Sequence, residues 1–301
     1  MRVAPLDWTA DPPGVTAERH LHAFRVLLLA HWVVQSWACW VRPLESPFTY
    51  PELPLVAAAL TLTALLALAF TRHARLACAL AFPIAVALAG WIFPGTPNHT
   101  FLAVLLLGLF AWFDLGREDD SRLLLQALRW MTVIVFFWAG AQKALNGLYF
   151  RGEFLSWMIA QSQDHWAAVF GWFVPAEEIE RLQALPRFHS GAGPYRVSAW
   201  PFLLASNGVW VGEIVLAGLM LARRFRHWAA VAAIGLVVMI QSAPHEWMFA
   251  LLYSQLLLLF VPGEWNRRLL PFFLGAYAWL LATLAGLAPG SSWLIKAGGY
   301  L

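Results

Sequence analysis

Residues 123–143 read LLLQALRWMTVIVFFWAGAQK, and this stretch decides the class of fold. Between Arg129 and Gln142 its side chains are almost all apolar. A helix needs about 20 predominantly apolar residues to cross the hydrocarbon core of a bilayer, and this stretch meets that length. We therefore expect it to form a membrane-spanning helix that ends at Lys143.

The composition of the whole chain agrees with this interpretation. Hydrophobic residues make up 60 % of the 301 residues and charged residues only 12 %, whereas soluble domains carry about 25 % charged residues. The net charge of +3 does not indicate nucleic-acid binding, because the arginines occur in short clusters between apolar runs, where they set membrane orientation. The sequence predicts an all-α, polytopic integral membrane helix bundle whose partner is the lipid bilayer and which binds no nucleic acid.

Nine apolar stretches have the character of spans, and an eight-span arrangement with one short pair re-entrant is the alternative. The predicted spans are 24–41, 53–70, 76–93, 99–113, 124–143, 199–222, 228–243, 247–262 and 270–288. The chain then divides into a cytoplasmic segment 1–23, a transmembrane domain 24–288 and a short tail 289–301.

Arginines mark alternate connections, and positive charge in short loops indicates the cytoplasmic side. This distribution predicts a multi-pass protein of a bacterial inner membrane, with its N-terminus in the cytoplasm and its C-terminus outside. The connections on the predicted inner side carry Arg2, Arg19 and Arg25, then Arg72 and Arg75, Arg117 and Arg122, Arg223, Arg224 and Arg226, and Arg267 and Arg268.

The segment 150–198 is too long and too aromatic for a simple loop. Residues 154–174 are mostly apolar but are interrupted by Gln161, Gln163, Asp164 and His165. We interpret this part as one amphipathic helix that lies on the outer membrane interface. Residues 186–194 are expected to be irregular, and the segment leaves no room for a separate soluble domain.

Lys143 is one of only two lysines in the chain, and it lies at the outer end of its predicted span. One interpretation is an interfacial anchor whose amine reaches water. The other is a partly desolvated amine, because burial favours the neutral form of lysine, which can act as a general base. Asn146 follows three residues later and shares its helical face.

His99 is the first residue of the preceding predicted span, 99–113. It is expected at the same membrane depth as Lys143. Two such groups on consecutive spans can converge in one site. The alternative is an ordinary helix start, in which Asn98 caps the helix and His99 faces water.

Glu213 falls deep in the sixth span, about two-thirds of the way toward the inner face, and Asn207 precedes it on the same helix. A buried carboxylate either forms a structural hydrogen bond or lines a polar cavity, and both alternatives stay open. His31 and Gln35, four residues apart, are expected to pair structurally. His245 and Glu246 are expected to be solvated loop residues.

Sequence motifs for phosphate-binding loops, zinc hydrolases and serine triads are absent from the chain, and no metal site is predicted. Two stretches resemble the HTTM family, the membrane domains related to vitamin K-dependent γ-carboxylase. They are Asn98-His99-Thr100-Phe101-Leu102, and FFWAGAQK at 136–143 followed by LYFRG at 148–152. The resemblance covers residues 20–270. Within this range it includes Gly212-Glu213 and residues 262–265.

This resemblance implies a fold, a cofactor and an activity. The cofactor would be reduced vitamin K or a related quinol, and the activity that of a carboxylase, a lyase-type enzyme that also oxygenates the quinol. Lys143 matches the family's base, which deprotonates the quinol, and His99 matches the histidine of the carboxylation step. The residues expected to bind the substrate around them are Asn98, Gln142, Asn146, Asn207 and Glu213.

The larger carboxylases carry an extramembrane domain that holds the protein substrate, so a partner protein would supply that domain here. Gln241 stands near the place of a histidine that the family often carries. Two alternatives of other classes remain: a non-enzymatic membrane subunit that binds a quinone or lipid, and a small-solute transporter with Glu213 on its path.

Overall fold

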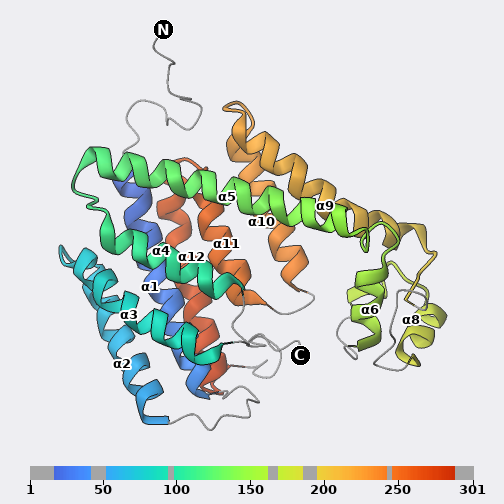
Figure 1. Ribbon diagram of the computed structural model, residues 1–301, viewed down its shortest axis with the longest axis horizontal. Helices are drawn as coiled ribbons and strands as arrows, with labels where there is room; N and C mark the ends of the chain where they lie inside the picture. Colours follow the sequence, from blue (N-terminus) through green and yellow to red (C-terminus); the bar gives the residue numbers. More distant parts are fainter. Residues whose placement is uncertain are drawn as a thin grey trace. The chain divides into compact units, whose positions relative to one another are not determined.

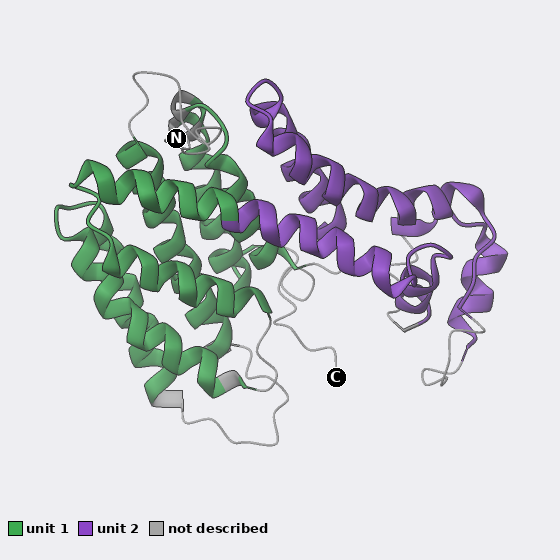
Figure 2. Cartoon of the chain, turned by 45° about the horizontal axis from the view of Figure 1, so that its top comes forward, with its two compact units in different colours: residues 1–130, 245–301 green, residues 131–244 purple. Residues whose placement is uncertain are grey.

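The computed structural model describes residues 17–41, 52–93, 98–161, 169–185, 195–242 and 246–288. Within these ranges the chain forms eleven helices and no strand (Figure 1). The helices fall into two compact units (Figure 2). Unit 1 comprises residues 1–130 and 245–301, and unit 2 comprises residues 131–244. Helix α5 contributes to both.

Unit 1 is built around helix α1, which packs against α2, α3, α4, α11 and α12. The side chains of Leu27, Leu28, Leu29 and Trp32 on α1 are fully buried, as expected for a helix surrounded by apolar neighbours. The helices of unit 1 are α1 (Ala17–Val41), α2 (Glu52–Ala69), α3 (Ala74–Ile92), α4 (Asn98–Trp112), the first half of α5 (Glu118–Asn146), α11 (Trp247–Leu258) and α12 (Gly263–Leu284).

Unit 2 contains the second half of α5, a pair of long helices and a pair of short ones. Helices α9 (Trp200–Leu221) and α10 (Arg226–Ser242) pack against each other, as do the short helices α6 (Glu153–Gln161) and α8 (Ala176–Gln183). The short pair has its own apolar cluster, which we call the lobe core. Its buried members are Leu155, Met158, Ile159, Ala160, Phe170, Val174, Leu182, Tyr195, Val197 and Phe202.

A helix lies in each of the nine segments predicted as spans. Three of these helices are long and apolar enough to cross a membrane, at Ala74–Trp91, Glu118–Asn146 and Trp200–Leu221. Five others are apolar over 10–17 residues only. Helix α1 has 25 residues, but its first turns hold Glu18, Arg19 and Arg25. The all-helical class is therefore confirmed, with three helices long and apolar enough to span a membrane among the described residues.

The segment after α5 differs from the predicted single amphipathic helix. Helix α6 ends at Gln161, residues 171–174 are not helical, and α8 starts after Pro175. Proline fixes its own backbone and disfavours helix in the residue before it, which separates α8 from the preceding turn. The polar residues 163–165 and the stretch 186–194 lie outside the described residues. The two short helices enclose the lobe core, which is part of unit 2.

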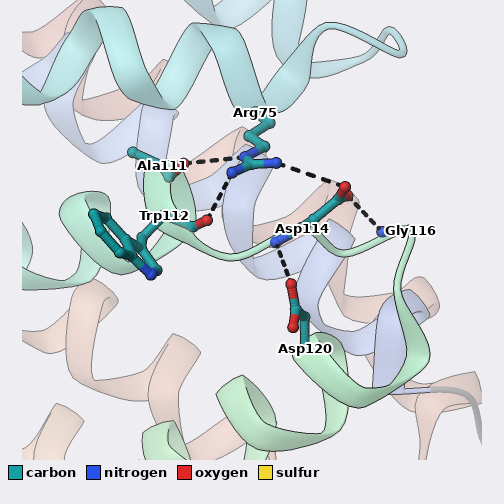
Figure 3. A network of polar contacts seen from close by, with 6 residues as sticks. All are labelled: Arg75, Ala111, Trp112, Asp114, Gly116 and Asp120. Carbon is teal, nitrogen blue, oxygen red and sulfur yellow. Dashed lines mark hydrogen bonds and ion pairs between the residues drawn. The ribbon is translucent and has the colours of Figure 1, made fainter.

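A polar network joins α3, α4 and the start of α5 in unit 1 (Figure 3). The Arg75 guanidinium donates to the carbonyl oxygens of Ala111 at 3.2 Å and of Trp112 at 2.8 Å, at the C-terminal end of α4. It also lies 3.6 Å from the carboxylate of Asp114, whose backbone N–H donates to Asp120 at 3.3 Å. A cation at a helix C-terminus satisfies free carbonyl groups and opposes the helix dipole. The α2–α3 and α4–α5 connections therefore lie at the same end of the α3–α4 pair.

Arg129, near the middle of α5, is buried inside unit 1. Its side chain is 1 % exposed, and its Nε donates to the carbonyl oxygen of Leu259 at 2.8 Å. The guanidinium also lies 5.7 Å from the ring centroid of Phe260. His20 supports the same segment by donating from Nε2 to the carbonyl of Val261 at 2.9 Å. The end of α11 thus turns back inside unit 1, with side chains satisfying its carbonyl groups.

The predicted His31–Gln35 pair is replaced by contacts between helices. Nδ1 of His31 lies 3.2 Å from the hydroxyl of Tyr277 on α12, and the amide of Gln255 on α11 donates to that same hydroxyl. All three side chains are buried. Buried polar groups find partners where the packing supplies them, and here α11 and α12 supply a better partner than the same helix.

Candidate functional site

Lys143 and Glu213 form a salt bridge inside unit 2. The Lys143 ammonium donates to both carboxylate oxygens of Glu213, at 2.7 Å to Oε1 and 2.8 Å to Oε2. The Lys143 side chain is 20 % exposed and that of Glu213 only 6 %. The Glu213 carboxylate is therefore buried, whereas part of the Lys143 side chain is exposed.

The pairing corrects the predicted depths of the two residues. Glu213 lies 13 residues after the start of α9, which is about 20 Å along a helix, whereas Lys143 lies three residues before the end of α5. The two helices are therefore offset along their axes. The first turn of α9 packs on the short helix pair instead, since Phe202 is part of the lobe core. The end of α5 consequently meets the middle of α9.

Gly140 allows α5 and α9 to approach closely next to this pair. A Cβ atom at Gly140 would lie 2.8 Å from the carbonyl oxygen of Trp210, 2.9 Å from Cβ of Glu213 and 2.9 Å from Cγ1 of Ile214. Distances below 3.0 Å are not tolerated by real Cβ atoms. Gly140 precedes Lys143 by three residues, so the two share one face of α5. The absence of a side chain at 140 permits the contact that brings Glu213 to Lys143.

The turn after α5 is fastened to α9 by hydrogen bonds. The hydroxyl of Ser206 donates to the carbonyl of Tyr149 at 2.8 Å, and the amide of Asn207 donates to the carbonyl of Phe150 at 3.2 Å. The indole of Trp210 donates to the side-chain oxygen of Asn207 at 3.0 Å. The turn therefore has a fixed place on α9, one to two helical turns before Glu213.

Tyr149 in this turn completes the surroundings of the amine. The Lys143 nitrogen lies 5.7 Å from its ring centroid, a distance at which a cation is attracted to an aromatic face. The ring also stacks on Phe154 of α6, with centroids 5.2 Å apart. Burial, with a smaller contribution from the charge of Glu213, raises the pKa of the Tyr149 phenol. The phenol therefore stays protonated at neutral pH.

The turn after α5 contains Gly147 and Gly152, and we expect their substitution by alanine to have different effects on stability. Gly147 and Gly152 have φ of +71° and +67°, a region that costs other residues about 1–2 kcal/mol. A Cβ at Gly152 would also lie 2.6 Å from the ring of Phe202, whereas at Gly147 the nearest atom is 3.8 Å away. We expect Gly152→Ala to lower the thermal unfolding midpoint clearly more than Gly147→Ala. Equal midpoints in the two variants would show that the Phe202 contact does not matter.

The other predicted binding residues do not surround the salt bridge. Asn207 serves the turn, as described above. Gln142 and Asn146 have exposed side chains, and within the described residues no hydrogen bond joins either one to Lys143 or Glu213. The end of α5 and the turn after it also carry exposed apolar side chains, those of Leu145, Leu148 and Phe150.

His99 and Asn98 belong to unit 1. Asn98 is the first residue of α4, with an exposed side chain. The His99 ring is half-buried and lies 5.7 Å from the ring of Phe249. Lys143 belongs to unit 2. The convergence of His99 with Lys143 therefore stays a prediction.

The residues near the end of α10 need one correction. Glu246 is not a fully solvated loop residue, because its side chain is half-buried and burial raises the pKa of its carboxyl. The side-chain oxygen of Gln241 is buried. His245 lies outside the described residues.

Sequence reasoning missed Gly140, Tyr149 and Ser206 as parts of the site. Gly140, Tyr149 and Gly152 stand in the two stretches 136–143 and 148–152 that carry the family resemblance, but a single sequence does not show that Gly140 contacts α9. Among the described residues, no group of three or more His, Cys, Asp and Glu is placed to hold a metal ion. Comparison of the chain with protein-family models, with curated proteins and with solved structures gives no match.

Proposed function

We propose that this chain is an integral membrane protein of the HTTM type that binds a reduced quinol, such as reduced vitamin K, and removes its hydroxyl proton with Lys143. The observation that carries the proposal is the Lys143–Glu213 pair, since an ionisable pair among apolar helices is costly and most often functional. The proposed membrane domain has nine crossings, formed by the nine helices other than α6 and α8. Its N-terminus faces the cytoplasm of a bacterial inner membrane.

The surroundings of the amine suit such a substrate. The amine is partly exposed, and the exposed apolar side chains of Leu148 and Phe150 lie in the turn that also holds Tyr149. A lipid-dissolved quinol has an apolar ring that such side chains can contact, and a polar hydroxyl that an amine can bind. The quinol supplies the oxygen chemistry. The chain supplies the position of the hydroxyl and the base that accepts its proton.

The reaction that follows from this role consumes oxygen. A quinol and molecular oxygen together give the quinone epoxide and water, so the atoms and electrons balance. In carboxylases of this type the same reaction drives carboxylation of a glutamate, and here a partner protein would present that residue. Quinol oxygenation by the chain itself is the part open to a direct test.

The test is an epoxide assay on the purified full-length protein in nanodiscs. Reduced vitamin K and air are added, and the epoxide is quantified by chromatography against an anaerobic sample. We expect epoxide to accumulate beyond one equivalent in air and to stay at background without oxygen. Background epoxide in air, from protein shown to bind the quinol, would count against an enzymatic role.

A non-enzymatic quinone-binding subunit is the second candidate. The observation that favours it is that Glu213 already neutralises the Lys143 ammonium through both oxygens, and an ammonium held in this way is a hydrogen-bond donor rather than a base. Such a subunit would bind the oxidised quinone as tightly as the reduced form, produce no epoxide, and co-purify with a partner protein.

A further inference from the structure

Lys143, the proposed base, is paired with the carboxylate of Glu213. An ammonium group has three N–H donors and no lone pair, so it cannot accept a proton from a substrate. Lys143 directs its amine at both oxygens of Glu213. Any chemistry of this amine therefore depends on what the carboxylate does with the shared proton.

We propose that Glu213 is the positioning residue for Lys143: it aims the amine and controls its protonation, and Gly140 sets the helix contact that makes this possible. This inference rests on the proposed function. In the step that follows, the ammonium passes one proton to the carboxylate, leaving a neutral amine and a carboxylic acid. The amine lone pair then accepts the proton of the quinol hydroxyl, and the quinol becomes an anion.

The exposure of the two partners supports this direction of transfer. The carboxylate is 6 % exposed and the lysine 20 %, so only the lysine side of the pair can be approached by a substrate. Proton transfer within the pair converts two buried charges into two neutral groups. Neutral groups are favoured when a bound apolar ring excludes water, because desolvation penalises charged forms.

Gly140 is the second part of the proposal. Two of the three atoms that a Cβ would meet are the carbonyl oxygen of Trp210 and Cβ of Glu213, and neither can swing aside as the end of a long side chain can. An added methyl group must therefore push α9 away from α5. The glycine lies one helical turn before Lys143, so this shift acts directly on the ion pair.

Among the described residues, the ionisable groups that face the amine come from two elements. Glu213 faces it from α9, and Tyr149 faces it from the turn after α5. Because the Tyr149 phenol stays protonated at neutral pH, Glu213 is the group whose charge controls the amine in that range. Replacing Glu213 should therefore change the pH dependence of Lys143, which a purely mechanical role would leave unchanged.

The test measures the chemical reactivity of the Lys143 amine and does not need activity. The chain has only Lys143 and Lys296, so a full-length Lys296→Arg background leaves a single lysine. The protein in nanodiscs is treated with acetic anhydride at pH 6–11, and acetylation of the peptide that contains Lys143 is quantified by mass spectrometry. Only the neutral amine reacts, so the pH of half-maximal labelling reports its protonation.

We expect Glu213→Gln to lower this midpoint measurably, because a carboxylate within hydrogen-bond distance favours the charged amine. Glu213→Asp, which keeps the charge, should restore most of the difference. Gly140→Ala should shift the midpoint in the same direction by a smaller amount, while Gly218→Ala on α9, where a Cβ would meet nothing within 4 Å, should leave it unchanged.

Several results would overturn the inference. An unchanged midpoint in Glu213→Gln would show that the carboxylate does not control the amine. Equal behaviour of Gly140→Ala and Gly218→Ala would remove the role of the close contact. If Glu213→Gln does not fold, the labelling midpoints of Gly140→Ala and Glu213→Asp are compared with that of the wild type instead. A midpoint that shifts as expected in a protein that makes no epoxide would support the pair and reject the proposed reaction, so the two failures are distinguishable.

Discussion

Replacing Lys143 with alanine should lower the rate of epoxide formation by about 10²–10⁴-fold, the usual contribution of a positioned general base. The expected loss follows from the geometry, because within the described residues the site has no second amine to take the proton. Initial rates of epoxide formation at saturating reduced vitamin K are the measurement. Quinol binding should fall much less than the rate, since the apolar side chains around the turn remain.

Lys143→Arg separates a chemical role for this residue from an electrostatic one. Arginine keeps the positive charge and can pair with both oxygens of Glu213, but its guanidinium does not lose its proton in proteins. We expect this variant to fold as well as the wild type and to lose as much activity as the alanine variant. Lys296→Ala, which alters the only other lysine, serves as the matched control. Wild-type activity in Lys143→Arg would show that the ion pair is structural and that the base lies elsewhere.

Much of the fold could be predicted because apolar length is a local property. Residues 76–93, 124–143 and 199–222 were predicted as spans, and α3, α5 and α9 lie there with ends that differ by a few residues. The ends differ because caps and local contacts set them. Helix α11 stops at Leu258, four residues before its predicted end, where Arg129 and His20 accommodate the turn.

The helix pair between α5 and α9 was not predicted, because its stabilisation depends on contacts distant in sequence. Glu153 on α6 pairs with Arg196 at 3.1 Å, and Arg181 on α8 donates to the carbonyl of Arg196. Polar residues within an apolar stretch are equally typical of a helix lying on a membrane surface. Hydropathy alone does not distinguish an interfacial helix from a small packed lobe.

The candidate site could be predicted as two separate residues but not as a pair. Lys143 and Glu213 each attract attention because ionisable side chains are rare in apolar helices. Their contact depends on the axial offset between α5 and α9, and the first turn of α9 packs in the lobe core through Phe202. Gly140 lies in the stretch FFWAGAQK, but only the distances to α9 show that it permits a close helix contact, whereas Gly208 and Gly218 have open space around them.

Arg129 offers a similar contrast in unit 1, since a buried arginine and an exposed one occur on the same helix. Arg129 is 1 % exposed and donates to a backbone carbonyl near the end of α11. Arg122, seven residues earlier, pairs with Glu118 on the surface, where both side chains are more than 60 % exposed. A buried hydrogen bond from a charged group contributes about 1.5–3 kcal/mol, whereas exposed pairs contribute little.

Arg129→Met should therefore destabilise the protein strongly, while Arg122→Met should not. Methionine keeps the length and apolar stem of the side chain but leaves the Leu259 carbonyl without the Nε donor, at a cost of about 1.5–3 kcal/mol. The measurement is the thermal unfolding midpoint in detergent, followed by circular dichroism, with the Arg122→Met midpoint equal to wild type. Because Leu259 follows α11 in unit 1, limited proteolysis of Arg129→Met should first release fragments cut near residues 259–262. Cleavage that begins elsewhere, or equal midpoints in the two variants, would show that Arg129 does not support the end of α11.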